Sequence, residues 1–270
     1  MKKIVSFLAA AALAAGMLTG CGQTGESDWK YVQDKGTLKI GITLFDPMNY
    51  YDPQDPQKLI GFDTELAEAV CAKLGVTPEF VEIDWDQKTV ELQSKSIDCI
   101  WNGMTILDDL KESLDFSVPY SGNMQVCVIN KANASVYTTL ESMATARFVA
   151  EAESAGAKSV EGSEALKGAQ LTAVQAQRDT LLELKSGTAD VAVIDAVMAY
   201  ASVGEGTSYS DLMVVEGIEL SKEEYGIGFR KGSDITAKVN DALQQLANDG
   251  TVAALAEKYP SVLPLLEAKG

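Results

Sequence analysis

Residues 38–42 read LKIGI, and residues 61–75 read GFDTELAEAVCAKLG. The first stretch alternates apolar residues with polar or small ones, which predicts a β-strand. In the second stretch Leu66, Val70 and Leu74 recur every four residues on one face. This spacing predicts a helix that ends at Gly75. Asp63 is expected to cap the start of this helix.

The same order of strand and helix continues along the chain. Since the pattern restarts after Lys131, we predict two α/β units, each with a mostly parallel sheet covered by helices on both faces. Ser233 or Asp234 is expected to cap the first of the two C-terminal helices. Further strands are predicted at residues 80–83, 99–101, 148–150, 171–174 and 191–194, and further helices at residues 89–94, 179–185, 235–246 and 252–258.

The composition favours an ordinary globular protein that does not bind nucleic acid. Of the 270 residues 46% are hydrophobic and 23% are charged, which is enough for a sizeable core. The net charge of −17 repels nucleic acid. The sequence has no histidine, which removes the commonest general base, the usual serine triad and most zinc sites. We therefore expect no metal and no cofactor.

The N-terminal segment has the features of an export signal. A positively charged start precedes an apolar stretch, residues 4–17, that is too short for an ordinary transmembrane span. The stretch ends in Leu18-Thr19-Gly20-Cys21, which resembles the bacterial lipobox. The resemblance implies a lipoprotein signal peptide at residues 1–20, acyl chains on Cys21 and a tether at residues 21–28. The mature protein would then be lipid-anchored to the cell membrane and face away from the cytoplasm.

Three further cysteines, Cys71, Cys99 and Cys127, lie among apolar residues without CxxC spacing. Small buried apolar side chains are the simplest interpretation of such cysteines. A disulfide between two of them is also compatible with export, and the sequence does not select a pair.

Five stretches between Thr37 and Tyr259 resemble the extracellular solute-binding proteins of ABC importers for polar amino acids. Their order and rough spacing, rather than any one of them, carry the resemblance. The stretches are GTLKIGI at residues 36–42, GFDTELA at 61–67, GMTI at 103–106 followed by DFSVPY at 115–120, LKSGTAD at 184–190 continuing to Asp195, and YGIGFRKG at 225–232.

The resemblance implies a two-lobed fold of the periplasmic-binding-protein type (type II). Two α/β domains would be joined by two hinge strands, near residues 125–130 and 226–230. Lobe 1 would comprise residues 29–126 and 228–270, and lobe 2 residues 127–227. A small polar solute, above all an amino acid, would bind in the cleft at the carboxyl ends of the strands, and the lobes would close over it. The closed form would deliver this solute to an ABC permease without doing chemistry on it.

Asp195 directly follows the apolar strand at residues 191–194. A carboxylate at the end of a strand that faces a cleft can accept charge-assisted hydrogen bonds from an ammonium group. The alternative interpretation is that Asp195 caps a helix that begins at Ala196. The resemblance favours contact with the ligand, because the family has a binding carboxylate at this position.

The resemblance assigns six more residues to the ligand. Main-chain and hydroxyl groups near the third strand and at a helix start in lobe 2 would bind its polar groups, although Glu153 replaces the family's glycine at that start. Two aromatic residues would sandwich its side chain, unless they are ordinary core or rim aromatics. The six are Asn102, Gly103, Thr105, Ser154, Phe45 and Trp85.

Leu110 departs from the family pattern. The family has an arginine here that binds the α-carboxylate of the ligand, and leucine cannot form such a pair. Either another cation replaces it, with Arg147 and Arg178 as the nearest candidates in lobe 2, or the ligand has no free α-carboxylate. Further polar contacts near the cleft are expected from Tyr50, Tyr51, Asn123 and Gln125.

Two other functions stay open. Periplasmic dehydratases of aromatic amino-acid precursors resemble these binding proteins, and Glu151, Glu153 and Asp195 would be acid–base groups in such an enzyme. The absence of histidine and of a dense catalytic cluster argues against this alternative. A ligand-sensing lipoprotein would use the same two lobes with a receptor as its partner.

Overall fold

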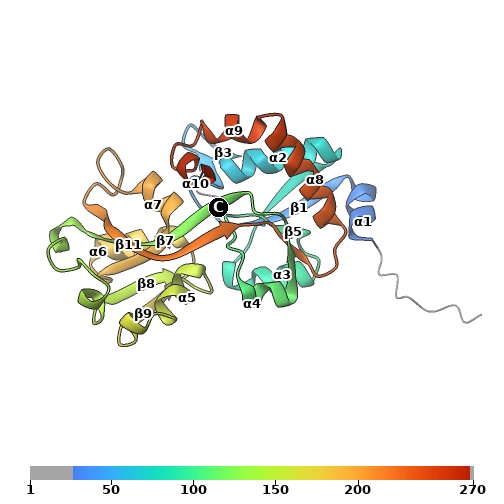
Figure 1. Ribbon diagram of the computed structural model, residues 1–270. Coiled ribbons are helices and arrows are strands. Elements are labelled where there is room, and N and C mark those ends of the chain that lie inside the picture. The colour runs from blue at the N-terminus through green and yellow to red at the C-terminus, as the bar shows by residue number, and fades with distance from the viewer. Residues whose placement is uncertain (1–26, 268–270) are drawn as a thin grey trace, which may run out of the picture.

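The computed structural model describes residues 27–267, which form two α/β lobes side by side (Figure 1). The predicted signal peptide, Cys21 and most of the predicted tether lie outside the described residues. Within residues 27–267 no helix is both long enough and apolar enough to cross a membrane.

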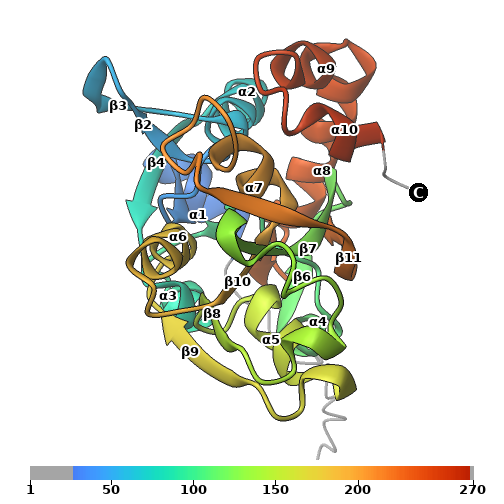
Figure 2. The ribbon, with the colours of Figure 1, turned by 90° about the vertical axis from the view of Figure 1, so that its left-hand side faces the viewer.

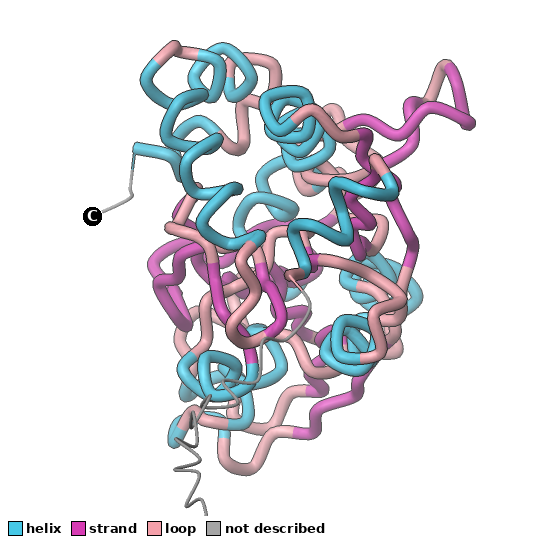
Figure 3. The backbone as a smooth tube through the Cα atoms, turned by 90° about the vertical axis from the view of Figure 1, so that its right-hand side faces the viewer, coloured by secondary structure: helices cyan, strands magenta, loops and turns pink. Residues whose placement is uncertain are grey.

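Lobe 1 is built on a five-stranded sheet in the order β4-β1-β5-β12-β6. A two-stranded hairpin, β2–β3, projects from this lobe (Figures 2 and 3). The strands are β1 (Thr37–Ile42), β2 (Tyr50–Asp52), β3 (Asp55–Ile60), β4 (Thr77–Glu82), β5 (Cys99–Ile100), β6 (Leu114–Phe116) and β12 (Gly228–Arg230). The helices are α1 (Asp28–Lys35), α2 (Phe62–Leu74), η1 (Trp85–Gln87), α3 (Lys88–Gln93), α4 (Asp108–Ser113), α8 (Ile235–Asn248), α9 (Thr251–Ala256) and α10 (Leu263–Glu267).

Lobe 2 is built on a second five-stranded sheet, in the order β11-β7-β10-β8-β9. Its strands are β7 (Ser121–Asn130), β8 (Arg147–Glu151), β9 (Gln170–Val174), β10 (Val191–Asp195) and β11 (Leu212–Tyr225). Its helices are η2 (Lys131–Asn133), η3 (Glu141–Met143), α5 (Ala155–Glu161), η4 (Glu164–Leu166), α6 (Gln177–Ser186) and α7 (Ala196–Ser202).

Both sheets are mixed, whereas the sequence pattern predicted mostly parallel ones. In each sheet three strands are parallel, β4-β1-β5 and β10-β8-β9, and the other two are antiparallel to their neighbours. The antiparallel strands include β7, β11 and β12, which lie next to the connections between the lobes. At these connections the chain passes from one lobe to the other and reverses its direction within the sheet. β7 and β11 pair with each other and extend from one lobe to the other (Figure 1). Residues 121–124 of β7, slightly before the predicted crossing at residues 125–130, do not pair with β10.

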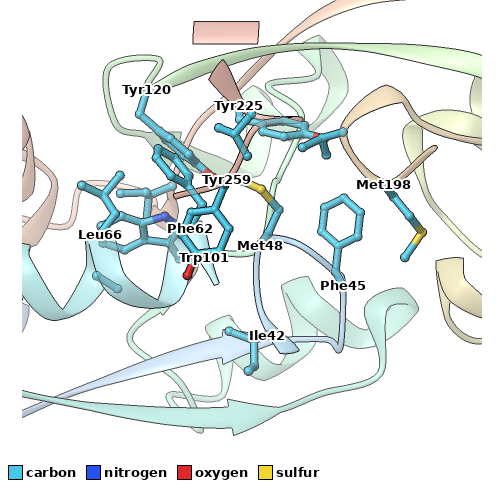
Figure 4. Packing of buried hydrophobic residues seen from close by; sticks show 14 of the residues in the cluster. Ile42, Phe45, Met48, Phe62, Leu66, Trp101, Tyr120, Met198, Tyr225 and Tyr259 are labelled. Atoms are coloured by element: carbon cyan, nitrogen blue, oxygen red, sulfur yellow. The ribbon is translucent and has the colours of Figure 1, made fainter. Parts of the chain in front are cut away.

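The main hydrophobic cluster extends through both lobes. It includes Phe62 and Trp101 of lobe 1, Met198 of lobe 2, and Tyr225 at the end of β11, and Figure 4 shows these side chains together with Phe45. The lobes therefore share buried apolar surface close to their connection. Cys71, Cys99 and Cys127 are all buried, and none of them forms a disulfide. They are therefore small buried apolar side chains, as the first of the two interpretations predicted.

The prediction that Asp63 caps α2 is wrong. The cap residue is Gly61, and the first N–H groups of the helix donate to main-chain carbonyls of Pro47 and Met48, so no side-chain cap is needed. Asp63 instead points inward with no exposed surface. Its Oδ2 accepts from the N–H of Gly103 at 2.7 Å and from the hydroxyl of Tyr120 at 2.8 Å. Asp63 thereby holds the loop that follows β5.

A second predicted cap also has another role. Asp234 occupies the N-cap position of α8 but makes no capping hydrogen bond with its side chain. Its carboxylate accepts from the N–H of Trp29 at 2.8 Å and from the hydroxyl of Ser27 at 2.5 Å. Asp234 therefore attaches the start of α1 to lobe 1.

Candidate functional site

A pocket lies where the carboxyl ends of strands from both sheets meet, as is general for ligand sites in open α/β sheets. Its walls come from the segments after β1, β4 and β5 in lobe 1 and after β8, β9 and β10 in lobe 2. The lobes leave a cavity of about 30 Å³ there, room for roughly two water molecules. The structure brings all seven predicted ligand residues to this pocket: Phe45, Trp85, Asn102, Gly103, Thr105, Ser154 and Asp195.

Asp195 is the centre of a buried amide cluster. It stands at the N-cap position of α7 but makes no capping bond with its side chain. One carboxylate oxygen accepts from the side-chain amides of Asn123 and Gln125, and the other accepts from that of Gln177. The N–H of Asp195 also donates to Oε1 of Gln177 at 2.9 Å. These bonds fix the carboxylate at the pocket wall, so the structure favours the cleft position over the capping role.

Glu223 connects this cluster to lobe 1. It lies on β11, and its carboxylate accepts from the hydroxyl of Thr105 at 2.8 Å and from Asn123 and Gln125 at 3.1 Å. The same two amides therefore serve both Asp195 and Glu223. Because the hydroxyl of Thr105 donates to Glu223, its lone pairs remain for a ligand N–H group.

The loop after β5 packs closely under Phe45. Gly103 has a φ of +56°, and a Cβ atom there would come within 2.6 Å of Cε1 of Phe45, so only glycine fits. The N–H of Gly103 is bound to Asp63, so the expected main-chain contact to the ligand cannot come from this N–H. Asn102 uses its side-chain amide for Asn49 and for the carbonyl of Thr43. These bonds make the loop a rigid floor of the pocket.

Ser154 begins the predicted helix of lobe 2. It caps α5, and its hydroxyl accepts from the N–H of Ala157 at 3.1 Å. The preceding residue, Glu153, has a φ of +54°. This is the left-handed region that favours glycine, which accounts for the family's glycine at this position. The glutamate keeps the backbone conformation, so its replacement of glycine does not prevent the helix start.

Lys88 supplies the positive charge of the pocket and was not predicted. It is buried, and its Nζ donates to the carbonyl oxygens of Trp85 at 3.0 Å and Glu153 at 3.1 Å. Burial lowers the pKa of Lys88 to about 8. Neither arginine considered for this role lines the pocket: Arg147 pairs with Asp190, and Arg178 is exposed and lines a separate groove with Gln175.

Lys88 and Gln177 are the main pocket residues that the sequence analysis missed. Lys88 follows Trp85 by three residues, a spacing that puts both side chains on the same face of a helix, and this signal was available. Gln177 gives no signal, because its contact with Asp195 joins residues 18 apart in sequence. Of the polar residues expected near the cleft, Asn123 and Gln125 contact Asp195, whereas Tyr50 and Tyr51 do not line the pocket.

Contacts between the lobes hold the pocket closed. The Nε2 of Gln175 donates to Asp84 at 2.7 Å, and Lys158 forms an ion pair with Asp109. The bond from Lys88 to the carbonyl of Glu153 also joins the lobes. Within residues 27–267 there is no cluster of three or more potential metal ligands.

The two buried carboxyls of lobe 2 make stability depend on pH. Burial and the charge of Glu223 raise the pKa of Asp195 to about 7, and burial and the charge of Asp195 raise the pKa of Glu151 to about 8. Their ordinary values are 3.8 and 4.5. A carboxyl with a raised folded pKa stabilises the fold while protonated, and this stabilisation is lost as pH rises through the folded pKa.

We therefore expect the free energy of unfolding to fall between pH 5 and pH 7. The change is up to about 1.4 kcal/mol per pH unit for each carboxyl. Lys88 remains protonated in this window and does not offset it. Urea unfolding at both pH values measures the change. Asp195→Asn should remove part of it, and an unchanged pH dependence in this variant would contradict the assignment.

Known solute-binding proteins resemble this chain in both sequence and structure. The family model for bacterial extracellular solute-binding proteins, family 3, matches residues 38–261. The L-cystine-binding protein TcyJ of Escherichia coli (strain K12) is 29% identical over 231 residues, 84% of each chain. An ancestral arginine-binding protein bound to arginine is 33% identical, with a TM-score of 0.76 over 83% of this chain and 98% of that one. The ancestral amino acid-binding protein AncCDT-1, a precursor of cyclohexadienyl dehydratase, is 28% identical, with a TM-score of 0.77 over 86% and 99%.

Proposed function

Because the chain belongs to the bacterial extracellular solute-binding proteins of family 3, as its five motifs predicted, we propose that it captures an amino acid between its lobes and delivers it to an ABC permease. The observation that carries this proposal is the pocket shared by both lobes. Phe45, Trp85 and Thr105 reach it from lobe 1, and Ser154 and Asp195 from lobe 2. A ligand held by both sides stabilises the closed arrangement, which the permease would recognise.

Asp195 binds the ammonium group of the ligand in this proposal. Its amide partners hold the carboxylate in place, so little entropy is lost on binding. Micromolar affinity corresponds to about −8 kcal/mol. Two or three ionic hydrogen bonds of roughly 1.5–3 kcal/mol each, together with aromatic burial, supply this against the cost of closure. The cavity of about 30 Å³ is smaller than an amino acid, so the lobes must separate for the ligand to enter.

The hinge lies along the paired strands β7 and β11. The proposed boundaries, at residues 126/127 and 227/228, fall within β7 and just after β11. Opening about this ribbon would break the contacts Gln175–Asp84 and Lys158–Asp109. The lobes would keep their own sheets while the pocket opens.

A thermal-shift screen of amino acids, amines and small peptides on the purified protein tests the proposed function. A true ligand stabilises the fold by mass action, by about 2.7 kcal/mol at a hundredfold excess over its Kd. We expect at least one amino acid to do so. Stabilisation by none of them would overturn the proposal. Turnover of prephenate-like acids would favour a dehydratase instead, an alternative kept open by the similarity to AncCDT-1 and by the carboxyls Glu151, Glu153 and Asp195 in one pocket.

The membrane location rests on Cys21, which lies outside the described residues. We propose that Cys21 carries the acyl chains of a lipoprotein, so that the mature protein stays on the outer side of the cell membrane. Each buried methylene contributes roughly 0.8 kcal/mol, so two or three chains anchor a protein firmly. Cells fed labelled palmitate should label the wild type and not Cys21→Ala. Equal labelling of both would contradict the anchor.

A further inference from the structure

Lys88 reaches the pocket from lobe 1 with one hydrogen-bond donor to spare. Lys88 is 5% exposed, and its Nζ lies 4.8 Å from the centre of the Trp85 ring. An ammonium has three N–H donors. Two of them are used by the carbonyls of Trp85 and Glu153. The third is available to a group inside the pocket, which Lys88 lines.

Glu151 reaches the same pocket from the end of β8 in lobe 2. It is 4% exposed, and among the described residues its Oε1 has no hydrogen-bond partner. A buried polar atom without a partner costs about 1–3 kcal/mol, and more when charged. The charges that act on it are those of Asp195, Lys88 and, with the smallest effect, Asp179. A donor from a ligand would relieve this cost, most of all a positively charged one.

We propose that Lys88 binds the α-carboxylate of the ligand and Glu151 binds a second cationic group, so the ligand is an amino acid with a positively charged side chain. The inference rests on the proposed function, in which Asp195 takes the α-ammonium. Lys88 thus replaces the arginine that is absent at Leu110, a residue that lines the pocket without contributing charge. Lys88 comes from α3, whereas Leu110 lies on α4.

The charges of the two sides balance. Once a cationic ligand is bound, Asp195 and Glu151 are ionised and bring two negative charges, and Lys88 brings one positive charge. The remaining charged group of the lining, Glu153, is exposed to solvent. A cationic amino acid brings two positive charges and one negative charge. A neutral amino acid would bring no cation to Glu151, so this buried carboxyl would gain no charged partner and no compensation for its unpaired oxygen. An acidic amino acid would bring a second carboxylate and no second cation, so the pocket should discriminate against it most strongly.

Calorimetry with two sets of matched probes tests the inference. The first set is L-arginine, L-citrulline (similar shape, neutral side chain) and agmatine (no carboxylate). The second is L-lysine, L-norleucine and cadaverine. We expect the cationic amino acid of at least one set to bind at least tenfold more tightly than both of its analogues. The inference is overturned if, in both sets, the neutral analogue binds as tightly as its cationic partner.

Single substitutions assign the two roles. Glu151→Gln should weaken binding of the cationic amino acid at least tenfold and change that of its neutral analogue less than threefold. Lys88→Met should weaken binding of both the cationic amino acid and its neutral analogue at least tenfold. It should change binding of the amine without a carboxylate less than threefold. Lys88→Arg should bind both amino acids more tightly than Lys88→Met does. Glu164→Gln and Lys167→Met, on exposed side chains, are the matched controls. The Lys88 assignment is overturned if Lys88→Met weakens agmatine as much as arginine.

The outcomes separate this inference from the proposed function. Binding of neutral amino acids that depends on Asp195, without preference for cationic ones, overturns the inference and leaves the proposed function intact. Binding of no amino acid at all overturns both. Thermal unfolding without ligand shows that each variant is folded, and unchanged binding of the insensitive probe confirms an intact pocket.

Discussion

Replacing Asp195 with alanine is expected to weaken amino-acid binding by roughly ten- to hundredfold. The loss follows from one charge-assisted hydrogen bond of about 1.5–3 kcal/mol, where each 1.4 kcal/mol is a factor of ten. Alanine also leaves the amides of Asn123, Gln125 and Gln177 without their common acceptor. They would reorient into the pocket and disturb its wall. Isothermal calorimetry on the purified variant measures the change in Kd.

Asp211→Ala is the matched control for Asp195→Ala. It removes the same charge from the same lobe at an exposed position outside the pocket. Its Kd should stay within about twofold of the wild type, because surface charges contribute little. An Asp195→Ala variant that is folded and binds as tightly as this control would remove Asp195 from the site.

The second large effect concerns stability. Asp63→Ala should lower the free energy of unfolding by about 2–4 kcal/mol, because it leaves two buried donors, the N–H of Gly103 and the hydroxyl of Tyr120, without an acceptor. Burial raises the pKa of Asp63 to about 7, so much of the carboxyl is protonated at pH 6. Asp63→Asn keeps an acceptor and no charge, and at pH 6 it should cost less than half as much as alanine.

Urea unfolding at pH 6 measures both Asp63 variants. Asp108→Ala, whose side chain is 96% exposed, is the control and should change stability by less than about 0.5 kcal/mol. If Asp63→Ala cost less than about 1 kcal/mol, the loop after β5 would not depend on this carboxylate. Because that loop carries Gly103 and Thr105, the alanine variant should also bind ligand more weakly.

Much of the fold follows from local patterns. The apolar run at residues 191–194 and the fourfold spacing of Leu66, Val70 and Leu74 each gave an element that the structure contains as β10 and α2. Hydrophobic periodicity predicts these elements because the burial of one face shows in the spacing of apolar residues within a short stretch of sequence. The caps failed for the opposite reason. Asp63 accepts a hydrogen bond from Gly103, 40 residues away, and Asp234 accepts one from Trp29, 205 residues away. No local sequence pattern indicates such distant partners.

In the pocket, too, some residues could be predicted from the sequence and others depend on contacts between distant residues. The seven predicted residues came from positions that the family resemblance assigns, and the two sheets bring the strand ends near these positions together. Lys88 was missed although its spacing from Trp85 places both on one helix face, because only the fold shows its Nζ bound to the carbonyl of Glu153 in the other lobe. Glu151 was noted as an acid in the sequence, but its unpaired oxygen is a property of packing. The proposed specificity therefore depends on contacts between the lobes, which a single sequence does not show.

A crystal structure of the protein with the amino acid that binds most tightly tests the central claim most directly. We predict the α-ammonium nitrogen within about 3 Å of the Asp195 carboxylate, with the lobes closed and the side chain of the ligand against Phe45 and Trp85. A ligand bound outside this pocket, or one inside it that leaves Asp195 with only its amide partners, would contradict the account.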